Sequence, residues 1–118
     1  MFHELSKREK KIARVCIDKG LDAQFRESLE KFDSVITNWR NGKFEANKEA
    51  YHELYRTVME QNKAIARRYD DLTGSRYLNT VAEIYVDGYI NDDDIKDFSE
   101  EVRLWMVRVK EMRRSEKD

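Results

Sequence analysis

Two pairs of carboxylates stand one helical turn apart in this sequence. Glu49 is followed by Glu53, and Glu83 is followed by Asp87. Residues four apart share one face of an α-helix, so each pair can offer its oxygens to one Mg²⁺ ion. If both pairs met at one pocket, they would form the acidic centre of a divalent-metal-dependent hydrolase.

Paired acidic motifs on neighbouring helices resemble those of the all-α nucleotide pyrophosphohydrolases, which space their acids more closely. The resemblance implies a nucleotide substrate and catalysis by Mg²⁺. Both pairs fall on the polar backs of the predicted helices, where charged residues are expected whatever the function. A divalent-metal-dependent all-α nucleotide hydrolase is therefore the alternative prediction.

The segment from Glu83 to Asp94 invites comparison with a calcium-binding EF-hand loop. Gly88, Ile90 and Asp94 stand where that loop has its glycine, its hydrophobic residue and its last acidic ligand. Tyr85, however, occupies a position that requires an oxygen ligand. A glycine that ends one helix, followed by an acidic start to the next, explains the same residues. We predict no resident metal and no cofactor.

A basic cluster precedes these acids near the start of the chain. A basic helix face can meet phosphate groups, so a nucleic-acid-binding helical protein is a further alternative. No glycine-rich phosphate loop and no recognition-helix signature accompanies the cluster, which makes nucleic acid an unlikely partner. The cluster consists of Lys7, Lys10, Lys11 and Arg14.

Nucleophiles and metal-binding nitrogens are scarce. The two histidines, His3 and His52, are too few for a zinc or di-iron site built on histidine. Cys16 has no partner at CxxC spacing and is expected to be a buried, small apolar residue. We predict no catalytic residue, and the absence of such chemistry favours a non-enzymatic protein.

Length and composition indicate a single helical-bundle domain over residues 1–118. Charged residues make up 40% of the chain while the formal net charge is only −1, which fits long helices with solvated faces. The single cysteine cannot form an internal disulfide, which favours a reducing cytoplasm. Phe2 to Ile12 is too polar for a signal peptide, and no apolar run reaches the roughly 20 residues needed to span a bilayer. We expect a soluble cytoplasmic protein without membrane partners.

Four glycines and no proline punctuate the chain. Glycine suits the left-handed residue that ends a helix, because it has no Cβ to clash there. Reading each glycine as a stop predicts an all-α antiparallel bundle of about five helices, of which residues 47–72 form the longest. The stops are Gly20, Gly42, Gly74 and Gly88, and the predicted helices span residues 6–19, 22–40, 47–72, 75–87 and 91–114.

Apolar residues recur at alternating steps of four and three along three of these helices, which is the period of a helix face packed in a bundle. These stripes predict the main core of the protein. Asn62 interrupts one of them, either as a buried amide that sets the register or as an exposed one. The stripes are Phe25, Leu29, Phe32, Ile36 and Trp39; Tyr51, Tyr55, Val58, Asn62, Ile65, Tyr69 and Leu72; and Ile95, Phe98, Val102, Trp105, Val109 and Met112.

The last helix carries a second apolar face formed by Leu104, Met106 and Val107. This face is either covered by the chain itself or forms a subunit interface, most simply in a two-fold homodimer. We favour the interface. The leading prediction is therefore a non-enzymatic protein–protein interaction module that binds itself through the C-terminal helix, or binds another helical protein.

Overall fold

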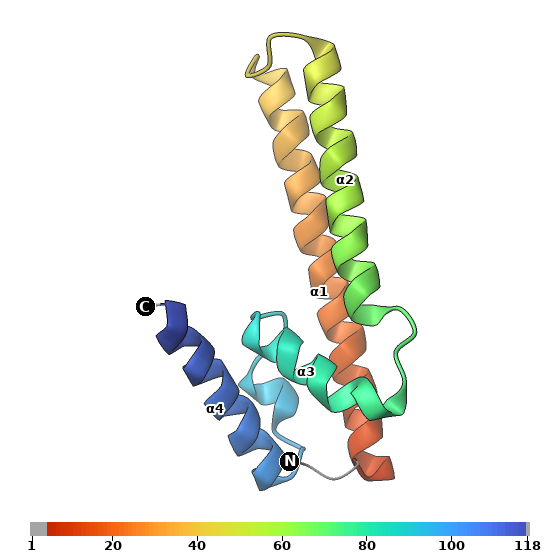
Figure 1. The fold of residues 1–118 in the computed structure, drawn as a ribbon, viewed down its shortest axis with the longest axis vertical. Helices are drawn as coiled ribbons and strands as arrows, with labels where there is room; N and C mark the ends of the chain where they lie inside the picture. Colours follow the sequence, from red (N-terminus) through yellow and green to blue (C-terminus); the bar gives the residue numbers. More distant parts are fainter. Residues whose placement is uncertain (1–4, 118) are drawn as a thin grey trace. The chain divides into compact units, whose positions relative to one another are not determined.

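The computed structural model describes residues 5–117, and this part of the chain is all-α, with four α-helices, two short 3₁₀-helices and no strand (Figure 1). The predicted all-α class is confirmed, but the number and lengths of the helices differ from the prediction. The elements are α1 (Lys7–Arg40), α2 (Asn47–Tyr69), η1 (Gly74–Arg76), α3 (Tyr77–Val86), η2 (Asp92–Ile95) and α4 (Glu100–Lys117).

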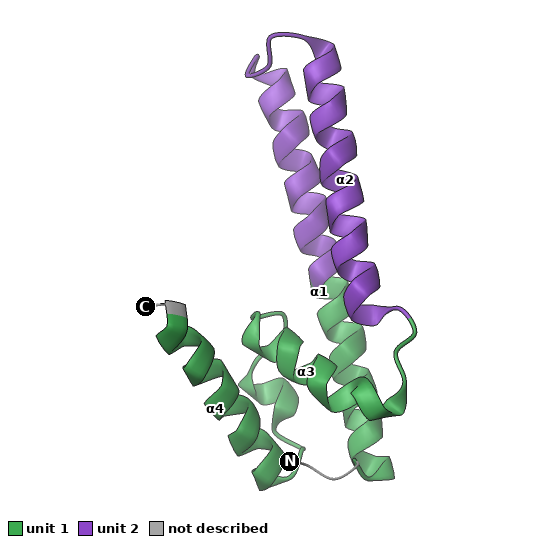
Figure 2. Ribbon diagram, in the orientation of Figure 1, with its two compact units in different colours: residues 1–23, 71–118 green, residues 24–70 purple. Residues whose placement is uncertain are grey.

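The chain forms two compact units (Figure 2). Unit 1 contains the start of α1, up to residue 23, together with everything from residue 71 onward. Unit 2 is the hairpin made by residues 24–70, in which the rest of α1 runs antiparallel to α2. The prediction of a single domain over residues 1–118 stays a prediction.

Helix α1 begins as the sequence indicates but does not end at Gly20. The Ser6 hydroxyl accepts a hydrogen bond from the Glu9 backbone N–H at 3.1 Å and so caps the start of the helix. Gly20 lies inside the helix, where a Cβ would come within 2.6 Å of the Ile84 side chain. Glycine is present here because α3 packs against the helix backbone. The predicted helices 6–19 and 22–40 are therefore one helix, and α1, not the helix at 47–72, is the longest.

Two of the other glycines do end helices. Gly42 and Gly88 have φ angles of +73° and +86°, in the left-handed region that residues with a Cβ rarely adopt. After α2, the residue with positive φ is Asp71 rather than Gly74, which begins η1 instead.

The predicted C-terminal helix is interrupted between η2 and α4. Asn91 and Asp94 form a reciprocal capping box at the start of η2. A second start follows at Ser99, whose hydroxyl accepts a hydrogen bond from the Val102 N–H at 3.3 Å. The Ser99 N–H in turn donates to the Glu9 carboxylate at 3.1 Å. This link to α1 fixes a new helix start where the sequence pattern predicts a continuous helix.

The core lies in unit 1, where α3 packs against α4 and against the start of α1. The expectation that the helices at 22–40 and 47–72 build the main core is wrong, because within the described residues Ala50 is the only buried apolar residue of unit 2. Within the same residues, no helix combines the length and apolar character needed to cross a bilayer. The buried apolar residues of unit 1 are Leu5, Ala13, Cys16, Ile17, Val81, Ala82, Ile84, Tyr85, Ile90, Ile95, Phe98, Val102 and Met106.

Candidate functional site

The two acidic pairs belong to different units. Glu49 and Glu53 lie on α2 in unit 2, where Glu53 forms an ion pair with Arg56. Glu83 lies on α3 in unit 1, and Asp87 caps the end of that helix. Among residues 5–117, no group of three or more His, Cys, Asp or Glu side chains is arranged to hold a metal ion.

The segment that resembles an EF-hand loop has a different structure. Its first half is the helix α3, and its acids are engaged in local contacts. The buried Tyr85 hydroxyl donates a hydrogen bond to Asp92, and Asp94 accepts from the Asn91 N–H and from Lys19. Burial alone would raise the pKa of Asp94, but these two donors more than offset it and hold the pKa below its ordinary value. The glycine stop and the capping box account for this segment.

In the basic cluster Lys7 and Lys11 are exposed and Lys10 is half-buried, whereas Arg14 and Cys16 make contacts within unit 1. On the basic face of α1, Arg14 donates to the Tyr77 hydroxyl at 3.4 Å and lies over the ring. Cys16 is buried, and burial is the main cause that raises its pKa to about 11. Such a thiol stays protonated and unreactive at neutral pH. His52 is exposed beside Tyr51, while His3 lies outside the described residues.

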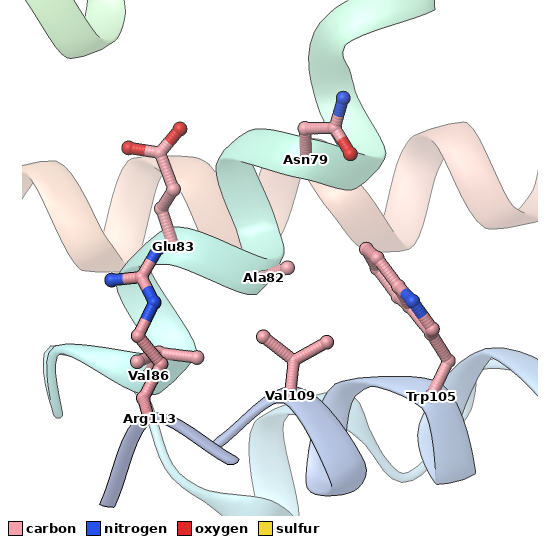
Figure 3. A pocket seen from close by; sticks show the side chains of 7 residues that line it. All are labelled: Asn79, Ala82, Glu83, Val86, Trp105, Val109 and Arg113. Atoms are coloured by element: carbon pink, nitrogen blue, oxygen red, sulfur yellow. The ribbon is translucent and has the colours of Figure 1, made fainter. Parts of the chain in front are cut away.

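Unit 1 contains a cavity of about 300 Å³ between α3 and α4. Figure 3 shows Glu83 and Arg113 at one end and Trp105 at the other, with apolar side chains between them. This size is at the lower limit for small-molecule sites. One acidic and one basic side chain beside apolar walls could match the shape and charge of a ligand. They do not provide a nucleophile paired with a general base. The lining residues are Asn79, Ala82, Glu83, Val86, Trp105, Val109 and Arg113.

The structure separates the three residues of the predicted C-terminal interface. Met106 is 0% exposed in the core of unit 1, so it is not part of any surface. Val107 is half-buried, and Leu104 is 53% exposed. A homodimer through Leu104 and Val107 stays a prediction.

A larger apolar surface lies in unit 2. It lies beside the seam, which is the line of polar contacts where α1 meets α2. Where α1 meets α2, the Ser28 hydroxyl donates to the Gln61 side chain at 2.9 Å, and Arg68 donates to Gln24 at 3.0 Å. Gln24 and Ser28 are buried. The hairpin is thus closed by polar side chains, and its apolar stripes lie elsewhere.

Three stripe residues directly follow a seam residue in the sequence. Phe25 and Leu29 follow Gln24 and Ser28, and Asn62 follows Gln61. Successive residues of an α-helix are rotated by about 100° around its axis. On both helices the stripe is therefore turned about a quarter turn from the seam, in the direction in which the chain winds. In an antiparallel pair, equal rotation away from a shared seam brings both stripes to the same side. The stripes of α1 and α2 therefore form one surface, here called the hairpin face.

The hairpin face is largely uncovered. Tyr51 is 71% exposed, Leu29 63% and Tyr55 61%, and Phe25 and Val58 are also exposed. These five side chains together expose roughly 500 Å². Contiguous apolar patches beyond a few hundred Å² mark interaction sites on soluble proteins. The hairpin face consists of Phe25, Leu29, Phe32 and Ile36 from α1 and Tyr51, Tyr55, Val58, Asn62 and Ile65 from α2.

The opposite side of the hairpin is polar. It is formed by the residues that precede the seam positions, and two ion pairs, Lys31–Glu27 and Arg56–Glu53, lie along it. The same backbone geometry thus presents apolar side chains on one broad side and charged ones on the other. The polar residues are Glu27, Ser34, Glu49, Glu53, Glu60 and Arg67.

Comparison with protein-family models, with curated proteins and with solved structures gives no match for this chain. The candidate site is therefore defined by its geometry. The sequence pattern correctly groups Phe25, Leu29, Tyr51 and Tyr55 in helical stripes, but it assigns them to the core. A signal was present in the seam positions, since Gln24, Ser28 and Gln61 are unusual side chains for the centre of a bundle.

Proposed function

We propose that this protein is a non-enzymatic protein–protein interaction module whose contact surface is the hairpin face. The observation that carries the proposal is the exposure of large apolar side chains from two helices on one side of one hairpin, opposite a polar side. Because Met106 is buried in the core of unit 1, we favour the hairpin face in unit 2 over the C-terminal helix as the contact surface.

Energetics support this assignment. A hairpin whose seam is polar gains little free energy from burying its own apolar side chains, and most helical stability in proteins comes from the packing of an apolar helix face. Covering Tyr51, Leu29 and Tyr55 would supply the missing burial, because fully burying one such side chain contributes roughly 1.5–3 kcal/mol. A protein partner that offers a complementary apolar surface fits this requirement.

Site-specific photo-cross-linking in the cells that make the protein tests the proposal. A benzophenone side chain at position 55 lies on the hairpin face, and the same group at position 60 lies on the opposite side of the same helix. We expect position 55 to give a covalent adduct with an identified protein, either this chain or another, and position 60 to give none. Equal labelling at both positions, or no adduct at either, would exclude the hairpin face as a contact surface.

A further inference from the structure

We infer that the hairpin face is covered by the hairpin face of a second copy of this chain, so that two hairpins pack as an antiparallel four-helix bundle. This inference rests on the proposed function and names the partner. In a two-fold dimer the same surface serves on both subunits, and it must therefore be complementary to itself. The area, the order of apolar residues and the charges of the hairpin face meet this condition.

The area agrees with a stable dimer. The five most exposed side chains of two copies would bury roughly 1,000 Å² when the faces meet. The half-buried Phe32, Ile36 and Ile65 adjoin them on the same face and add to that area. With them, complete coverage of both faces would approach the lower end of the range of about 1,200–2,000 Å² that specific interfaces bury.

The stripe of α2 is nearly symmetric about Val58, although Tyr55 lies three residues before it and Asn62 four residues after it. Tyr51 and Ile65 both lie seven residues from this centre, as counted in the sequence. If a two-fold axis passes beside Val58, Tyr51 packs on Ile65 of the second copy, and Tyr55 lies opposite Asn62. The tyrosine hydroxyl then gives the Asn62 amide a polar partner inside an otherwise apolar stripe. A second copy thus accounts for an asparagine at a stripe position.

The stripe of α1 places the axis at the same height. Its apolar residues pair in reverse order about a point between Glu30 and Lys31, which sets Leu29 on Phe32 of the second copy. Ser28 is bonded to Gln61 across the seam. Because the two helices are antiparallel, moving forward along α1 corresponds to moving backward along α2. The point between Glu30 and Lys31, about two to three residues after Ser28, therefore lies level with a point about two to three residues before Gln61, which is beside Val58. One axis satisfies both helices.

Charges beside the stripe agree with this register. Arg26 and Asp33 flank the stripe of α1 on its outer edge and are both exposed. With the axis between residues 30 and 31, Arg26 of each copy lies about two residues from Asp33 of the other, within reach of its long side chain, and Arg26 also pairs with Glu30 of its own chain at 3.3 Å. On α2 the corresponding flank carries Met59, 41% exposed, which would meet Met59 of the second copy close to the axis.

Native mass in solution tests the inference on the full chain. We expect light scattering to give twice the mass of one chain at micromolar concentration. Leu29→Glu with Tyr55→Glu should convert the dimer to a monomer, because four carboxylates would enter one apolar interface. The matched control, Ser34→Glu with Asn38→Glu, adds the same charge on the opposite side of the hairpin and should leave the dimer unchanged.

Cross-linking tests the register without disrupting the interface. In a Cys16→Ala background, Met59→Cys should react with a short bismaleimide to give a covalent dimer, at least about tenfold faster than Glu60→Cys, since only position 59 lies beside its own copy. This pair of variants decides the question if the double glutamate variant loses its helices, as judged by circular dichroism. Equal rates at positions 59 and 60 would contradict the proposed axis.

The remaining outcomes separate this inference from the proposed function. A monomeric wild type overturns the second copy as partner; the proposed function then stands if the photoadduct at position 55 contains a different identified protein, and falls if there is no adduct. A dimer that survives Leu29→Glu with Tyr55→Glu but dissociates with Leu104→Glu overturns the inference in favour of the C-terminal helix.

Discussion

At the scale of single residues, Gly20 shows how one missing atom shapes this chain. A glycine within a helix costs about 1 kcal/mol relative to alanine, so its position inside α1 requires a compensating contact. That contact is Ile84, which is 0% exposed and whose Cδ1 lies 2.6 Å from the place of a Cβ. The close approach of α3 to α1 depends on this glycine.

Gly20→Ala should therefore destabilise the protein, although alanine is the better helix former. Overpacking a well-filled core costs about 1–3 kcal/mol, and we expect a net loss of about 1–2 kcal/mol in urea unfolding. Ile84→Val removes the atom nearest to the new methyl group. The double variant Gly20→Ala with Ile84→Val should lose less stability than the two single losses added together, and strict additivity would exclude the contact as the cause.

A second residue-scale prediction concerns alkaline pH. The Cys16 thiol ionises near pH 9 when the chain is unfolded but only near pH 11 in the folded protein, chiefly because it is buried. Between these values the folded state holds a proton that the unfolded state has lost, so the free energy of unfolding falls as pH rises. We expect a loss of about 2 kcal/mol between pH 9 and 11. Burial, aided by the hydrogen bond to Asp92, raises the pKa of Tyr85 to about 12, which extends the decline.

Urea unfolding at pH 8, 9, 10 and 11, at one protein concentration, measures this decline. Cys16→Ala should flatten the part between pH 9 and 11 and leave the contribution of Tyr85 in place. A Cys16→Ala variant with the same slope as the wild type would show that the thiol is not the group responsible.

At the scale of elements, the short helix η2 depends on Asp94. This carboxylate accepts the Asn91 N–H that would otherwise lack a partner at the helix start, and it pairs with Lys19 of α1 at 2.6 Å. Both contacts require the ionised form, which is why the pKa of Asp94 remains low in spite of partial burial. Asp94 thus links the element to α1 twice, since its backbone oxygen also accepts a hydrogen bond from the Cys16 thiol at 3.3 Å.

Asp94→Ala should lower stability at neutral pH by about 1 kcal/mol, the usual effect of losing a helix cap. Because the folded-state pKa of Asp94 is depressed, its contribution is present above the unfolded-state value of 3.8 and is lost as pH falls. The difference between the wild type and Asp94→Ala should therefore shrink on acidification below pH 4. Thermal unfolding from pH 7 to pH 3 measures it, and a difference that persists unchanged at pH 3 would contradict this assignment.

At the scale of the whole molecule, the sequence predicts the elements better than it predicts their surroundings. Helical periodicity correctly indicates an all-α chain and groups Tyr51, Tyr55 and Val58 on one side of a helix. Periodicity alone does not show what covers an apolar stripe, because a core and an interface impose the same spacing. The expected core at residues 22–40 and 47–72 is an exposed surface for this reason.

The predicted helix boundaries are wrong where tertiary contacts decide where a helix begins or ends. Gly20 has the residue type of a helix stop, yet the packing of Ile84 keeps it helical. The helix predicted over residues 91–114 is divided because Glu9, ninety positions earlier, binds the Ser99 N–H. Neither partner can be identified from residues close in the sequence. The glycines at positions 42 and 88 were predicted correctly because positive φ is a local property.

The polar seam of the hairpin has a consequence for the amount of protein in a cell. Ser28, Gln61, Gln24 and Arg68 close the hairpin with polar contacts, and Ala50 is the only apolar residue buried there among the described residues, so the proposed dimer would supply much of the free energy that keeps the hairpin closed. That free energy grows with the logarithm of concentration. If the proposed dimer forms, the hairpin would open more readily below its dissociation constant, and its turn at residues 41–46 would become a substrate for proteases. Scarce copies would then be cleared while abundant ones persist, and the half-life of the protein would rise with its own concentration.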